Sequence, residues 1–245
     1  TWNRFYLCRL EKALQAVSPD DDIALHYWDP TCDESLQHGL PETLTKEYVE
    51  IDGEKVKNPL RSFTVPREIV PYPHNVSYEA RAESDRDSNK FGSHLYKPVG
   101  YETTRYPFSG ICHPEPAKQI ASEHNENIKK VFGSDDAIVG ELNANIKQWL
   151  GVGESTHEGQ EMNPNSAYKL FEKSLDTPNY NAFSNTSTAA QEHVTSIENA
   201  HNNLHLAIGG FTAEDEGDET TFGLLSASNG DMAANEVSAF DPVFF

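Results

Sequence analysis

A pair of histidines four residues apart, His201 and His205, constrains this chain more than any other feature of its sequence. On a helix, side chains at this spacing lie one above the other on one face, so both imidazoles can bind the same metal ion. The apolar residues around the pair recur at steps of three and four, which predicts a buried helix. These apolar residues are Ile197, Ala200, Leu204, Ala207 and Ile208. The following Gly209 and Gly210 supply the left-handed residue that is typical of a helix C-terminus.

The start of this helix is predicted from a capping signal. Thr188, with Gln191 three residues later, fits the capping-box pattern, so we expect the helix to begin near Thr188. The histidine pair by itself leaves two interpretations open. The two side chains are either metal ligands or core histidines whose ring nitrogens are satisfied by hydrogen bonds.

The residue after His201 restricts the chemistry. The zinc-protease motif H-E-x-x-H requires a glutamate at this position as general base. This chain has Asn202 instead, and a neutral amide cannot take a proton from water, so the sequence argues against a metalloprotease. Coordination by imidazoles without thiolate suits copper, iron, nickel or zinc, and the residues alone do not choose among these metals.

Motifs near both ends of the chain resemble one protein family. Residues 196–210 are similar to the second copper site of tyrosinases and catechol oxidases, the type-3 copper phenol oxidases. Residues 229–232 (Asn-Gly-Asp-Met) and 239–245 (Ala-Phe-Asp-Pro-Val-Phe-Phe) follow in that family's order. Residues 2–7 and 27–29 resemble the segments that come after the first copper site. The resemblance covers most of the chain and looks most like the bacterial-type and short fungal forms.

The resemblance implies a fold and a cofactor. It implies a mainly α fold, with a central four-helix bundle, long loops and little β-structure, and a single copper domain over residues 1–245. Members of the family hold two copper ions, each by three histidine nitrogens. They use O2 to hydroxylate monophenols or to oxidise o-diphenols to o-quinones. His201 and His205 match two ligands of the second copper ion, and the implied partners are O2 and a small phenol.

The resemblance also implies residues that act beside the metal. Asn202 matches an asparagine that, with a glutamate, holds a water that deprotonates the incoming phenol. Glu198 is the expected glutamate because it lies in the matching Ser-Ile-Glu-x-x-His-Asn stretch, and Glu192 is the alternative. Phe244 matches an aromatic residue that packs over the substrate site. The competing interpretations are a solvated helix carboxylate for Glu198 and plain core packing for Phe244.

The chain also departs from the family's pattern. Asn3 stands where the family has the third histidine of the first copper site, and an amide oxygen is a much poorer copper ligand than imidazole. The other histidines of the first site would precede Thr1, and the last histidine of the second site would follow Phe245. We therefore expect residues 1–245 to lack both ends of the family's core.

Three functions remain open. The first is a phenol oxidase, and Asn202 with Glu198 favours monophenol hydroxylation. The second is a hemocyanin-like O2 carrier, which shares the copper core. The third is a copper-deficient or truncated homologue without catalysis, an interpretation that Asn3 favours.

The charge of the chain excludes other partners. Its formal net charge is −20, from 39 acidic and 19 basic residues. Nucleic acids and anionic membranes bind clustered Lys and Arg, so neither is expected as a partner. Residues 1–17 have the pattern of an amphipathic helix rather than of a signal peptide, and this favours a soluble, cytoplasmic protein, although the compartment stays unknown. The sequence leaves homo-oligomerisation open.

Periodicity and turn signals predict the remaining elements. Apolar residues at helical spacing predict helices at residues 4–17, 117–132, 135–150 and 166–175. Asp52-Gly53 predicts a β-hairpin over residues 48–56. Residues 33–44 are expected to be irregular, residues 23–28 to form a short buried segment, and the thiols to be mostly buried. The thiols are those of Cys8, Cys32 and Cys112.

Overall fold

The computed structural model describes residues 2–18, 22–69, 96–113, 115–152, 162–210 and 230–244. Within these ranges the chain is mainly helical, and the only sheet is a single two-stranded one, which confirms the expected fold class. None of the helices in these ranges combines the length and the apolar composition needed to cross a membrane.

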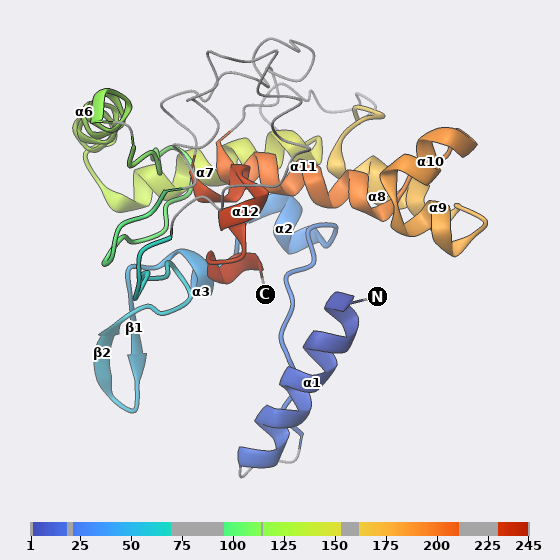
Figure 1. Ribbon diagram of the computed structural model, residues 1–245, viewed down its shortest axis with the longest axis horizontal. Coiled ribbons are helices and arrows are strands. Elements are labelled where there is room, and N and C mark those ends of the chain that lie inside the picture. Colours follow the sequence, from blue (N-terminus) through green and yellow to red (C-terminus); the bar gives the residue numbers. More distant parts are fainter. Residues whose placement is uncertain are drawn as a thin grey trace.

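The elements appear in Figure 1 under the labels used below. In chain order they are α1 (Trp2–Val17), α2 (Asp33–His38), α3 (Glu42–Thr45), β1 (Tyr48–Ile51), β2 (Glu54–Lys57), α6 (Glu115–Phe132), α7 (Asp135–Leu150), α8 (Ala167–Leu175), α9 (Tyr180–Ser184), α10 (Thr186–Glu192), α11 (Ile197–Gly209), the 3₁₀ turn η2 (Asp231–Ala233), α12 (Asn235–Ser238) and the 3₁₀ turn η3 (Pro242–Phe244). The helices predicted from periodicity correspond to α1, α6, α7 and α8 and are confirmed.

The hairpin prediction is also confirmed. Strands β1 and β2 pair antiparallel, with Ile51 opposite Glu54. Between them Asp52 and Gly53 both have positive φ, 53° and 79°. A two-residue hairpin turn of the type that matches strand twist requires positive φ at both positions.

The core lies where α7 and α11 pack together. Figure 1 shows these two helices side by side, with α6 crossing one end of α7 and α8 lying toward the other end. Helix α7 contributes most of the large buried side chains, and α11 contributes Ala207 and Ile208. The core residues are Leu40, Leu142, Ile146, Trp149, Leu150, Ala167, Ala207, Ile208 and Met232. The Nδ2 group of Asn145 donates to the carbonyl oxygen of Ala207 at 2.8 Å, which fixes the register of α7 on α11.

The expected helix start near Thr188 is wrong, because two helices occupy this stretch. Helix α10 ends at His193, which has a left-handed φ of 56°. Helix α11 then begins after Ser196, whose hydroxyl accepts from the backbone N–H of Asn199 while the Asn199 side chain accepts from the backbone N–H of Ser196. This reciprocal pair satisfies two N–H groups at the helix start, so the capping box lies eight residues after the expected one. The predicted end is confirmed, since Gly210 is left-handed with φ 111°.

The expectation that residues 33–44 are irregular is wrong. They contain α2 and α3, and α2 has Asp33 and Glu34 in its first turn and His38 in its last. The two carboxylates complement the positive end of the helix dipole. Gly39 follows with φ 78° and ends α2 by donating its N–H to the carbonyl oxygen of Ser35.

Two expectations about burial are also wrong. None of residues 23–28 is buried: each is half-buried or exposed, and the side chain of Tyr27 is 85% exposed. Cys8 is exposed because it lies on α1, which Figure 1 shows standing away from the packed helices. Cys32 and Cys112 are half-buried.

Two glycine substitutions test the packing at the end of α11. A Cβ added at Gly209 would overlap the backbone nitrogen of Ala233 and lie 2.6 Å from its Cβ. Because backbone cannot move as a rotamer does, Gly209→Ala is expected to lower the free energy of unfolding by about 1–3 kcal/mol. In α7, a Cβ added at Gly140 meets nothing within 4 Å, so Gly140→Ala is expected to raise that free energy by about 0.5–1 kcal/mol. Urea unfolding measures the free energy of unfolding of each variant. Equal changes in the two variants would contradict the close approach of Gly209 to the backbone of Ala233.

Candidate metal centre

Helix α11 brings His201 and His205 together. The two residues lie one turn apart on the capped helix, and their ring centroids are 4.5 Å apart with an interplanar angle of 70°. Their Nε2 atoms face each other at 3.1 Å. The structure therefore places both imidazoles at one point, as the i, i+4 spacing predicts.

The other ring nitrogens lie near oxygens that act as acceptors. Nδ1 of His205 lies 3.1 Å from the carbonyl oxygen of Met232. Nδ1 of His201 lies 3.2 Å from Oδ1 of Asn202. A backbone carbonyl oxygen only accepts, so the contact with Met232 assigns the N–H of His205 to Nδ1 and leaves the lone pair of this ring on Nε2. Two Nε2 lone pairs at this separation repel each other unless a proton or a metal ion lies between them.

The two rings differ in their surroundings. His205 is only 6% exposed, and His201 is exposed. Burial, and after it the neighbouring His201, lower the pKa of His205 below its usual value, which favours the neutral imidazole. The neutral form is the one that binds metal, and a carbonyl on the opposite nitrogen is the usual way in which proteins orient a ligating histidine.

The donor set fits copper. Imidazole donors without thiolate suit copper, as they also suit iron, nickel and zinc. In the described part of the chain, no cluster of three or more His, Cys, Asp and Glu side chains is arranged to hold a metal ion. The pair on α11 thus offers two nitrogen donors to one ion.

Glu198 and Asn202 lie on the same side of α11 as the two histidines, because Glu198 is three residues before His201 and Asn202 is three residues before His205. Oε2 of Glu198 accepts from the backbone N–H of Thr186 at 2.8 Å, a contact that uses one carboxylate oxygen and ties α11 to the start of α10. Glu192 lies on another helix, as the last residue of α10, and accepts from Nδ2 of Asn179 at 2.6 Å.

The other two predicted residues, Asn3 and Phe244, lie on elements other than α11. Asn3 is in the first turn of α1, and Figure 1 shows this helix well separated from α11. Helix α1 instead contacts the segment that follows it, because Oε2 of Glu11 accepts from the N–H of Leu25 at 3.1 Å. Phe244 ends η3, and its side chain lies outside the described residues.

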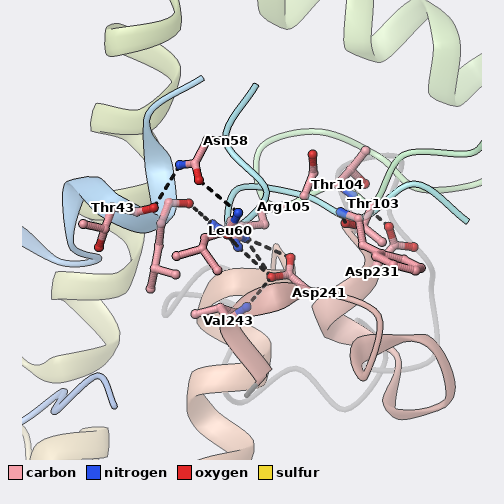
Figure 2. A network of polar contacts seen from close by, with 12 residues as sticks. Thr43, Asn58, Leu60, Thr103, Thr104, Arg105, Asp231, Asp241 and Val243 are labelled. Atoms are coloured by element: carbon pink, nitrogen blue, oxygen red, sulfur yellow. Dashed lines mark hydrogen bonds and ion pairs between the residues drawn. The ribbon is translucent and has the colours of Figure 1, made fainter. Parts of the chain in front are cut away.

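Sequence reasoning missed the partners of two buried carboxylates that follow α11 in the chain. Figure 2 shows two carboxylates, Asp231 and Asp241, that each bind the segment around Thr104 and Arg105. Arg105 donates to both oxygens of Asp241, from Nε at 2.8 Å and from Nη2 at 2.7 Å, and its other N–H groups reach the carbonyl oxygens of Leu44 and Leu60. Asp231 and Asp241 lie in the two motifs at residues 229–232 and 239–245, so the sequence did point to these carboxylates. It did not point to their partners, which lie far away in the chain.

The chain is similar to known tyrosinases over its whole length. A sequence model described as the common central domain of tyrosinase matches residues 1–245. Tyrosinase HcTyr2 of Hahella sp. (strain CCB-MM4) is 36% identical over 257 residues, which cover 100% of this chain and 42% of the relative. A tyrosinase of Aspergillus oryzae (strain ATCC 42149 / RIB 40) is 33% identical over 267 residues, covering 100% of this chain and 44% of the relative.

The fold is similar as well. The crystal structure of Burkholderia thailandensis tyrosinase at low pH superposes with a TM-score of 0.78 and 32% identity, covering 99% of this chain and 42% of that one. The same enzyme at high pH gives a TM-score of 0.76. The chain therefore spans less than half the length of the relatives that it matches.

Proposed function

The chain belongs to the tyrosinase family, and from that premise we propose that it forms part of a type-3 copper oxidoreductase that uses O2 to oxidise phenols. In this proposal His201 and His205 bind the second copper ion, within one copper domain over residues 1–245. The relatives whose names say tyrosinase support the proposal.

One observation carries the proposal. The Nδ1 atoms of His201 and His205 are each beside an oxygen acceptor, so their Nε2 lone pairs face one another at 3.1 Å. Two core histidines satisfied by hydrogen bonds would place a hydrogen on one of these two nitrogens. The acceptors at Nδ1 instead favour a metal ion as the group between the rings.

Bound copper would supply the redox chemistry with O2, and the protein residues would supply orientation and proton transfer. Asn202 holds the ring of His201 through Oδ1, which leaves its NH₂ group to donate to a water. Glu198, one turn earlier, has one carboxylate oxygen bound to Thr186 and a second that can accept from the same water. We assign to this pair the removal of the phenol proton, with Glu192 as the alternative carboxylate. Phe244 is proposed to pack against the phenol ring.

The two other functions make different predictions. A hemocyanin-like carrier would bind O2 without turning over phenols. A copper-deficient homologue, as Asn3 suggests, would retain at most one copper ion per chain. Copper content and O2 uptake therefore separate the three possibilities.

The proposal is tested on the full-length protein by copper analysis together with O2 uptake on L-tyrosine and L-DOPA. Copper retention with turnover of either substrate is expected. Asn202→Ala and Glu198→Gln are each expected to lower turnover of L-tyrosine about 100-fold, because positioned proton transfer contributes about 10²–10⁴-fold. Turnover of L-DOPA should change less.

Asn203→Ala is the matched control, since Asn203 is the next residue on α11 and its Nδ2 reaches the carbonyl oxygen of Asn165 at 3.5 Å. It should leave both activities unchanged. If Glu192→Gln impairs L-tyrosine turnover and Glu198→Gln does not, the carboxylate role moves to Glu192. Absence of copper from the purified full-length protein would refute the oxidase assignment.

A further inference from the structure

Asp231 is a buried carboxylate at the start of η2, and it binds Lys97, Tyr101 and Thr104 of a distant loop. The side chains of Lys97 and Asp231 are 3% and 1% exposed, and Nζ of Lys97 lies 2.7 Å from Oδ1 of Asp231. Nζ also donates to the carbonyl oxygen of Gly110 at 2.5 Å. The ammonium and carboxylate thus compensate each other inside the protein.

The second carboxylate oxygen is equally engaged. Oδ2 of Asp231 accepts from the hydroxyl of Tyr101 at 2.7 Å and from the backbone N–H of Thr104 at 2.8 Å. Burial, and after it the charge of Asp231, raise the pKa of Tyr101 well above its usual value, so the phenol remains a donor. These bonds hold the side chain of Asp231 in one orientation.

The backbone at Asp231 is held by the same loop and by α11. The N–H of Asp231 donates to the carbonyl oxygen of Thr104 at 2.9 Å, and the N–H of Gly230 donates to that of Gly209 at 2.6 Å. Gly230 is pressed against the loop, because an added Cβ would lie 2.7 Å from the carbonyl oxygen of Thr104. The peptide after Asp231 is therefore fixed between two elements.

The next carbonyl along the chain is the acceptor for the metal centre. Met232 is buried, and its carbonyl oxygen lies 3.1 Å from Nδ1 of His205. A histidine whose Nδ1–H is bound in this way presents Nε2 as the lone pair. The orientation of the Met232 carbonyl thus determines which nitrogen of His205 faces His201.

We propose that Asp231, held by Lys97, Tyr101 and Thr104, is a positioning residue that aims the Met232 carbonyl at His205 and so fixes this imidazole in the Nδ1–H form. Its relevance to copper rests on the proposed function, whereas the tautomer of His205 is a property of the metal-free chain. The loop at residues 96–110 thereby acts on the metal centre without supplying a ligand.

The test uses two double variants that both remove the buried ion pair. Lys97→Met with Asp231→Ala removes the charges and every acceptor of the carboxylate. Lys97→Met with Asp231→Asn also removes the charges but keeps one side-chain oxygen for Tyr101 and Thr104. Arg105→Met with Asp241→Ala is the matched control, because it removes the other buried ion pair of this region, whose side-chain contacts within the described residues go to Leu44, Leu60 and Val243 rather than to Met232.

The primary measurement is the ¹⁵N spectrum of the His205 ring in metal-free protein, which distinguishes the two tautomers. The first double variant is expected to show a mixture of tautomers, and the second and the control are expected to keep the Nδ1–H form. Copper affinity should fall about 10- to 100-fold in the first variant only, as found for partners of metal-binding histidines. An unchanged tautomer in the first variant, or the same loss in the control, would overturn the proposal.

Two single variants test the same proposal if the first double variant does not fold. Tyr101→Phe removes one bond to Asp231, and Tyr106→Phe removes a hydroxyl that donates to Glu141 at 2.9 Å. Only the first should shift the His205 Nδ1–H resonance, and equal spectra would count against positioning by Asp231. A changed tautomer with unchanged copper affinity would support the positioning and refute copper ligation by His205.

Discussion

His205→Ala is expected to lower the copper affinity of the protein by at least about 100-fold, because loss of a mere partner of a metal-binding histidine already costs about 10–100-fold. The variant removes the buried Nε2 donor that faces His201 at 3.1 Å and leaves a single exposed imidazole on α11. Competition against a chelator of known affinity measures the change. Phenol turnover is expected to disappear with the metal.

The matched control is His26→Ala, which removes an exposed histidine in the segment between α1 and α2. Its copper affinity and unfolding midpoint should equal those of the unmodified protein. If His205→Ala retains copper as tightly as His26→Ala does, His205 is a core histidine and the ligand assignment fails.

Arg105→Ala is expected to lower the free energy of unfolding by about 3–5 kcal/mol, because it leaves a carboxylate buried without its counter-charge. The side chains of Arg105 and Asp241 are 8% and 0% exposed, and the guanidinium also binds the carbonyl oxygens of Leu44 and Leu60. One side chain thus joins α3, the segment after β2 and the turn that precedes η3. The midpoint of urea unfolding, with the slope held constant, measures the loss.

An exposed ion pair provides the comparison. On the surface of α6, Nζ of Lys118 lies 2.9 Å from Oε1 of Glu115. Lys118→Ala is expected to change the free energy of unfolding by less than about 0.5 kcal/mol, because water screens such pairs. A similar loss in Lys118→Ala and Arg105→Ala would mean that burial of the Arg105–Asp241 pair does not determine its contribution.

The helices were predictable wherever a local pattern determined them. In α7 the apolar residues Ile138, Leu142, Ile146 and Trp149 recur at helical spacing, and all four are buried. The capping box of α11 was not predicted, because Ser196 pairs with Asn199 whereas the expected pattern required Glu or Gln at the fourth position. Residues 23–28 contain apolar side chains, but whether they are buried depends on which elements pack there, and a local pattern does not contain that information.

The candidate site divides in the same way. The i, i+4 spacing of His201 and His205 places both rings on one helical face in any sequence that forms this helix. The acceptor for His205 is a backbone carbonyl, that of Met232, and every residue has one, so the sequence does not single it out. Asp231 and Asp241 bind residues more than 120 positions earlier, at separations of 127 and 136 residues for Thr104 and Arg105. Pairings of that range follow only from the tertiary fold.

The two imidazoles of the proposed copper site differ in exposure, so one lies on its solvent side and the other on its buried side. In the proposed site we expect an ion from solvent to meet His201 first, because His201 is exposed whereas His205 is buried and contacts the carbonyl oxygen of Met232. Capture of the ion would then depend on His201. Its retention would depend on His205, whose Nδ1 is bound to the carbonyl oxygen of Met232. We therefore expect the rates of ion loading and ion release to depend on different residues, one turn apart on the same helix.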